Sequence, residues 1–144
     1  MTRSRTTSTN TPALSCPCEG AGIAPSRAYA VCCGRWHAGE QRLGAPTAEA
    51  LMRSRYSAFV LDLLDYLQDT WHPDTRPRDL QPNPVGLKWL GLQIKRHHSI
   101  DAGHAEVEFV ARSRFEGRAS RLHELSRFER VDGVWLYRDG DIRE

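Results

Sequence analysis

The stretch TAEALMRSRYSAFVLDLLDYLQDTW, residues 47–71, carries the strongest helical pattern in this chain. Its large apolar side chains recur every three or four residues, which is the spacing of one face of an α-helix. These side chains are Met52, Tyr56, Phe59, Val60, Leu63, Leu64 and Leu67. Thr47 is a good N-cap, and Glu49 lies in the first turn, where the helix dipole favours an acid. We therefore predict one long helix from Thr47 to about Trp71, with its apolar face in the core.

The second half of the chain changes to a period of two, which is typical of half-buried β-strands. The positions that share one side of each of four such segments are Leu90, Leu92 and Ile94; Ala105, Val107, Phe109 and Ala111; Leu122, Ser126 and Phe128; and Trp135 and Tyr137. The proline-rich stretch 72–84 is predicted as a loop. Short connections at 99–103 and 115–118 separate the strands, and Asp132–Gly133 is a strong hairpin signal. We predict an α+β fold, with the helix packed on a curved antiparallel sheet.

All four cysteines lie in CPCEGAGIAPSRAYAVCCG, residues 16–34. The two cysteines within each pair are too close to bridge each other comfortably. Disulfides between the pairs would suit an exported protein, but the first residues of the chain lack a secretory apolar core. The other interpretation is one metal ion held by two short thiolate clusters, and Zn²⁺ accepts four such ligands. We favour zinc, and binding it would supply the folding energy of a segment that has no core of its own.

The pattern CPC…Y…CCG…H resembles the SEC-C motif, the small zinc module at the carboxyl end of the SecA translocase ATPase. The segments AEALMRSRYSAFVLDLLDYLQDTWHP, KWLGLQI, AEVEFVAR, LHELSRFER and WLYRDG are similar to the YchJ-like family of small bacterial proteins. Members of that family carry the motif ahead of a cone-shaped domain. The resemblance spans about residues 15–140. It implies a zinc knuckle followed by a cystatin-like or nuclear-transport-factor-like cone, and it implies no particular activity.

In the resembling motif the residue after the third cysteine completes the metal site, and here that residue is Cys33. The predicted ligands of one structural zinc ion per chain are Cys16, Cys18, Cys32 and Cys33. His37 follows four residues after Cys33, so it either supports a ligand without binding the metal, replaces one of the ligands, or is an ordinary surface histidine. We expect three parts: a disordered tail (1–14), the SEC-C knuckle (15–38) and the cone domain (46–144).

Glu124 shares one side of its strand with Leu122 and Phe128, so its carboxylate is predicted to face the apolar side of the sheet. A buried carboxylate needs a partner. The candidate partners are Arg53, Arg55, Trp71 and His72. Cones of the superfamily that the resemblance indicates often place an acid in the cavity for acid–base catalysis, so Glu124 is the one catalytic candidate. A structural ion pair is the favoured interpretation of Glu124.

We favour an adaptor that is not an enzyme, whose zinc knuckle docks a protein partner. By analogy with the translocase motif, that partner is linked to a chaperone or the ribosome. The alternative is a small enzyme or ligand-binder that uses the cone cavity, with the zinc structural only. Nucleic-acid binding is disfavoured, because the net charge is only +2 and acids such as Glu106 and Glu108 are interleaved with the arginines. Without an apolar run of membrane-spanning length, we expect a cytoplasmic monomer with no membrane span.

Overall fold

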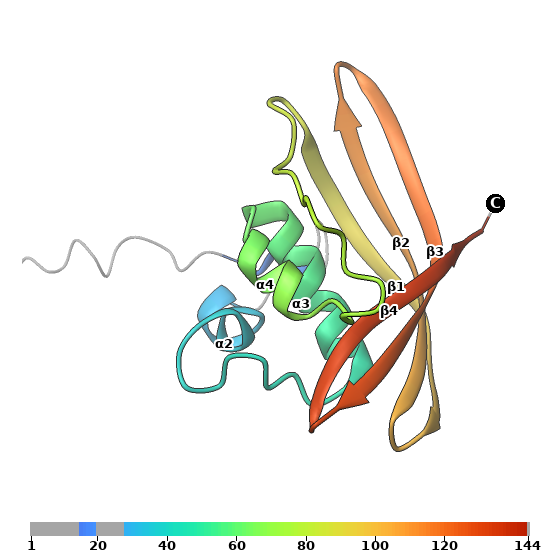
Figure 1. Ribbon diagram of the computed structural model, residues 1–144. Coiled ribbons are helices and arrows are strands. Elements are labelled where there is room, and N and C mark those ends of the chain that lie inside the picture. Colours follow the sequence, from blue (N-terminus) through green and yellow to red (C-terminus); the bar gives the residue numbers. More distant parts are fainter. Residues whose placement is uncertain (1–14, 20–27, 144) are drawn as a thin grey trace, which may run out of the picture.

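A curved four-stranded antiparallel sheet carries the helices on one of its faces (Figure 1). The computed structural model describes residues 15–19 and 28–143, so the predicted tail 1–14 lies outside the described residues. The strands follow the chain in the order β1 (Lys88–Asp101), β2 (His104–Phe115), β3 (Arg118–Val131) and β4 (Val134–Ile142). Before them come η1 (Pro17–Glu19), η2 (Tyr29–Val31), α2 (Gly34–His37), α3 (Ala48–Leu61) and α4 (Leu64–Asp69).

The stretch that was predicted as one long helix forms two helices, so the prediction of an unbroken helix is not confirmed. The predicted start is confirmed, because the backbone N–H of Ala50 donates to Oγ1 of Thr47 over 3.0 Å. α3 ends at Leu61 because Asp62 adopts a left-handed conformation, with φ 58° and ψ 42°. The backbone N–H of Asp62 then bonds back to the last turn of α3, which caps the helix, and α4 begins two residues later.

The predicted hairpin at Asp132–Gly133 is confirmed. Both residues have positive φ, 51° and 83°, as a type I′ turn requires. Glu116 and Gly117 connect β2 to β3 in the same way, with φ values of 52° and 79°. Leu90 departs from the predicted pattern, because it is 40% exposed next to a register shift between Trp89 and Gly91.

The main core lies between the concave face of the sheet and the helices α3 and α4. Its fully buried side chains include Leu51, Tyr66, Leu67, Val107 and Phe128. Trp36 of α2 belongs to the same cluster, and so does Ala45 of the segment that leads into α3. Trp36 and Ala45 therefore share the core of the sheet domain, whereas the four cysteines and Tyr29 form a second buried cluster.

None of the helices in the described part of the chain is both long and apolar enough to cross a membrane.

Candidate metal centre and cone cavity

Two short 3₁₀ turns bring the four cysteines together. Cys16 and Cys18 flank Pro17 at the start of η1, whereas Cys32 and Cys33 directly follow η2. All four are buried, and their Sγ atoms lie within 4.8 Å of one another. The Sγ atoms of Cys18 and Cys32 are 3.5 Å apart. A tetrahedron with Zn–S bonds of about 2.3 Å has sulfur–sulfur edges of about 3.8 Å, so the four donors fit a tetrahedral metal ion.

The crowded thiols change one another's protonation. Hydrogen bonds from Cys18 and Cys33 hold the pKa of the Cys16 thiol below its ordinary value. The hydrogen bond with Cys16 raises the pKa of Cys33, as does burial. A second thiolate in this space would repel the first, and a divalent cation offsets that repulsion. The chemistry of the donor set therefore suits a soft or borderline cation such as zinc.

Side chains of α3 hold the cysteine cluster against the cone domain. Oγ of Ser57 lies 3.5 Å from Sγ of Cys16, and Nη1 of Arg53 donates to the carbonyl oxygen of Cys18 over 3.2 Å. Ser57 and Arg53 stand one turn apart on α3, so one face of this helix meets the knuckle.

His37 is buried beside the cluster, not on the surface. Its Nε2 donates to the carbonyl oxygen of Ser54 over 2.8 Å, and its Nδ1 accepts a hydrogen bond of 2.5 Å from the hydroxyl of Tyr29. The ring also packs edge-on against Tyr66. Burial lowers the pKa of His37, which favours the neutral imidazole that this bonding pattern needs. With both nitrogens bonded, His37 stays outside the group of four sulfur donors, while its role toward a metal remains a prediction.

Glu124 faces a cavity of about 180 Å³ between α3 and the sheet, as the strand pattern predicts. The hydroxyls of Ser126 and Tyr137 each donate to its Oε2 over 2.8 Å. Among the described residues Glu124 makes no ion pair, so the structural ion pair expected from the sequence is replaced by two hydroxyl donors. The cavity is lined by Met52, Arg55, Phe59, Trp71, Phe109, Leu122, Glu124, Ser126 and Tyr137.

The basic side chain that lines this cavity is Arg55, which is only 2% exposed. Its Nη1 donates to the carbonyl oxygen of Leu67 over 2.9 Å and to Oγ1 of Thr70 over 2.7 Å. The guanidinium carbon lies 4.7 Å from the ring centre of Trp71 and 4.8 Å from that of Tyr137. Burial lowers the pKa of Arg55 to about 10, so the side chain keeps its positive charge at neutral pH.

Two other candidate partners of Glu124, Arg53 and His72, pair with different acids. Arg53 forms an ion pair with Glu49, and His72 lies 3.3 Å from Glu129. The functional group that sequence reasoning missed is Tyr137. Only the pairing of β3 with β4 brings its hydroxyl to Glu124, and the strand pattern gave Tyr137 as a core residue without a polar role.

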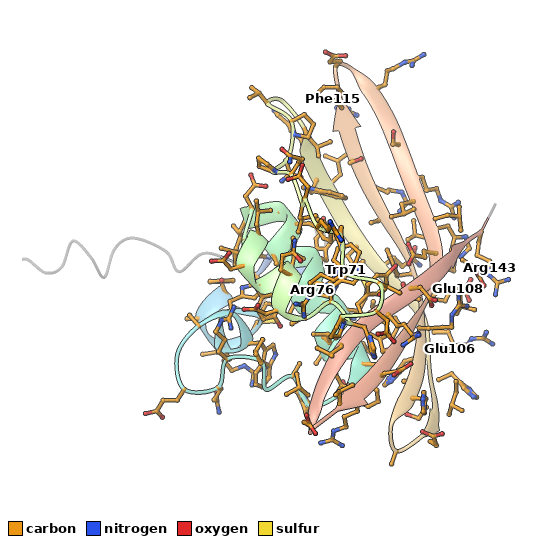
Figure 2. All side chains as sticks on the ribbon, viewed as in Figure 1. Trp71, Arg76, Glu106, Glu108, Phe115 and Arg143 are labelled. Carbon is orange, nitrogen blue, oxygen red and sulfur yellow. The ribbon has the colours of Figure 1, made fainter. Side chains whose placement is uncertain are left out.

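The convex face of the sheet carries paired charges. Glu106, Glu108 and Arg143 project on the side away from the helices (Figure 2). Nε2 of His123 lies 2.6 Å from Glu108, and Arg127 pairs with acids of β4. These ion pairs match the charge-paired face that the sequence indicates.

Comparisons with known proteins agree with this architecture. The model of the family "YchJ, middle NTF2-like domain" matches residues 47–140. A UPF0225 protein of Bordetella pertussis is 64% identical over 128 residues, which cover 89% of this chain and 92% of the relative. A UPF0225 protein of Methylibium petroleiphilum is 55% identical over 129 residues, with 90% and 89% covered.

Two solved structures share the fold. A SEC-C motif containing protein from Psychrobacter arcticus has a TM-score of 0.73 and 29% identity, covering 90% of this chain and 83% of that protein. A SEC-C motif containing protein from Rhodopseudomonas palustris has a TM-score of 0.72 and 31% identity, covering 91% and 100%. With its NTF2-like domain and its clustered cysteines, this chain belongs to the YchJ-like SEC-C family of UPF0225 proteins.

Proposed function

We propose that this chain is a zinc-binding protein in which one zinc ion per chain has a structural role. The observation that carries the proposal is the approach of four buried Sγ atoms to within 4.8 Å of one another. The proposed ligands are Cys16, Cys18, Cys32 and Cys33. Four thiolates complete a tetrahedral site and leave no open position for water, so the metal supplies cross-linking and no Lewis-acid chemistry.

The zinc ion would clamp the knuckle onto the cone domain. It would join residues 16–18 to residues 32–33, and the first of these parts contacts Ser57 and Arg53 of α3 through Cys16 and Cys18. We retain the knuckle (15–38) and the cone (46–144) as the two proposed parts of the chain. Because Trp36 lies in the main core, we infer that the two parts unfold together instead of independently.

Replacing His37 with alanine should separate metal binding from packing. We expect the variant to keep one zinc per chain, because all four sulfur donors remain. Its free energy of unfolding should fall by about 1–3 kcal/mol, because the buried carbonyl oxygen of Ser54 loses its donor. Zinc analysis and urea unfolding of the purified protein measure both effects. Loss of zinc from this variant would instead make His37 a ligand.

We propose that the knuckle also binds a protein partner, as an adaptor that works in the cytoplasm as a monomer. Two features support this role: the SEC-C motif of the similar structures, and Val31, which is 58% exposed directly before Cys32. A chaperone- or ribosome-linked partner rests on analogy with the translocase motif. In the test, Val31→Asp should abolish partner binding without loss of zinc, whereas Val85→Asp, at a side chain that is 98% exposed, should leave binding unchanged. Equal binding by both variants would contradict the adaptor role of the knuckle.

The second candidate function is ligand binding in the cone, with the zinc structural only. It is favoured by the cavity of about 180 Å³, which holds two charged side chains, Arg55 and Glu124, among apolar walls. Concave apolar sites with a few converging polar groups are typical of small-molecule binding.

A further inference from the structure

We propose that the cone cavity binds a small, flat, apolar molecule that carries a neutral amide group. The amide carbonyl would accept a hydrogen bond from Arg55, and the amide N–H would donate to Glu124. This inference rests on the second candidate function and names its ligand class.

Arg55 has hydrogen-bond donors that no described residue uses. Among the described residues, no carboxylate forms an ion pair with this buried guanidinium, and Nη1 is its one nitrogen with hydrogen bonds. A buried cation is costly unless it is paired or fully hydrogen-bonded. Nε and Nη2 of Arg55 therefore have no acceptor among the described residues, and a ligand in the cavity that Arg55 lines would supply one.

Glu124 also has one carboxylate oxygen that accepts no hydrogen bond from the described residues. Ser126 and Tyr137 both donate to Oε2, which leaves Oε1 without a hydrogen bond in the described residues. Gly140 leaves the space that this carboxylate occupies. A Cβ atom added to Gly140 would overlap Oε2 of Glu124, so a side chain at this position would displace the carboxylate.

The opposite charges of Arg55 and Glu124 favour a ligand group without net charge. A ligand carboxylate would bond well to Arg55 but would meet the negative charge of Glu124, and a ligand ammonium group would meet the positive charge of Arg55. An amide carries a donor and an acceptor side by side and has no net charge. It can satisfy both side chains at once, and hydrogen bonds to charged groups are stronger than those between neutral groups.

The apolar space next to these two side chains extends into a second hollow. A second hollow of about 330 Å³ lies next to the first, and the two share Met52, Phe59, Phe109 and Leu122. Trp89 and the loop 81–84 line its other side. Cavities of about 150 Å³ lined by apolar side chains already accept a benzene ring, so the paired hollows have room for a flat ring and its amide.

Three benzene derivatives of similar size test the ligand class. Benzamide, benzoate and benzylammonium are titrated into the isotope-labelled, zinc-loaded full-length protein, and NMR shifts of cavity residues are followed. We expect benzamide to bind at least about tenfold more tightly than either charged probe, since two charge-assisted hydrogen bonds are worth at least that factor. Tighter binding of benzoate or benzylammonium would overturn the amide assignment while leaving ligand binding intact. If none of the three binds, both the inference and the ligand-binding function fail.

Substitutions at the acid give a second readout. In Glu124→Gln, benzoate should gain about tenfold because the repelling charge is gone, and benzamide should weaken several-fold. Glu106→Gln, on the convex face of β2 (Figure 2), is the matched control and should change neither probe. Gly140→Ala should also weaken benzamide, because it displaces the carboxylate without removing it. Unchanged probe affinities in both Glu124→Gln and Gly140→Ala would overturn the role of Glu124.

Discussion

Replacing Cys33 with serine is expected to release most of the zinc and to destabilise the whole chain. Cys33 is 2% exposed and belongs to the group of four converging sulfur atoms. A hydroxyl is a poor replacement for a thiolate toward zinc, and the three remaining thiolates leave an open coordination position. Structural zinc sites in small zinc-finger peptides contribute about 10–16 kcal/mol of apparent binding energy. Part of the knuckle is also held by α3, so we expect a loss on the order of 5 kcal/mol here.

Elemental analysis and urea unfolding measure this effect, with His37→Ala as the matched comparison. We expect one zinc per chain in His37→Ala and a large loss of bound zinc in Cys33→Ser. Hydrogen exchange on the zinc-free protein adds a local measure: protection should fall in α3, around Ser54 and Ser57, as well as in the knuckle. Full zinc occupancy in Cys33→Ser would remove this residue from the ligand set.

Replacing Phe128 with alanine is expected to lower the free energy of unfolding by about 3–5 kcal/mol, the usual cost of removing a buried phenylalanine. Phe128 lies near the C-terminal end of β3, is 1% exposed and packs edge-on against Tyr137, with ring centres 5.7 Å apart. The variant leaves a void beneath the cavity wall, so Tyr137 should also hold Glu124 less firmly.

Phe115→Ala is the control for this prediction. Phe115 is the last residue of β2, at the tip of the β2–β3 hairpin (Figure 2), and it is only partly buried. We expect a loss of at most about 1 kcal/mol there. Chemical denaturation of both variants compares their free energies of unfolding. Equal losses of this free energy would contradict the central place of Phe128 in the core between α3 and the sheet.

The hydrophobic pattern predicted which side of each helix or strand is buried better than it predicted where a helix ends. Met52, Tyr56 and Leu67 keep the same apolar stripe across the break between α3 and α4, because the stripe is set by contact with the sheet. The break itself depends on the positive φ of Asp62, whose Oδ1 accepts from the backbone N–H of Asn83, 21 residues away. A spacing of apolar residues carries no information about such a contact.

In the candidate sites, too, the sequence predicts contacts between neighbouring residues better than contacts between distant ones. The cysteine pairs are close in sequence, so their convergence could be predicted from spacing alone. The partners of Glu124 could not, because Tyr137 reaches it from another strand past a register shift between Arg127 and Phe128. The burial of Arg55 is equally hidden, since a charged residue on a helix is ordinarily assigned to the exposed face.

X-ray absorption at the zinc edge of protein purified without chelator identifies the atoms that surround the metal. We expect one zinc per chain, surrounded by four sulfur atoms at about 2.3 Å, with no nitrogen or oxygen neighbour. The spectrum should not change when benzamide is added, because the metal has no open position. A shell of three sulfur atoms and one nitrogen or oxygen atom, or protein that carries no zinc, would contradict the four-thiolate structural site.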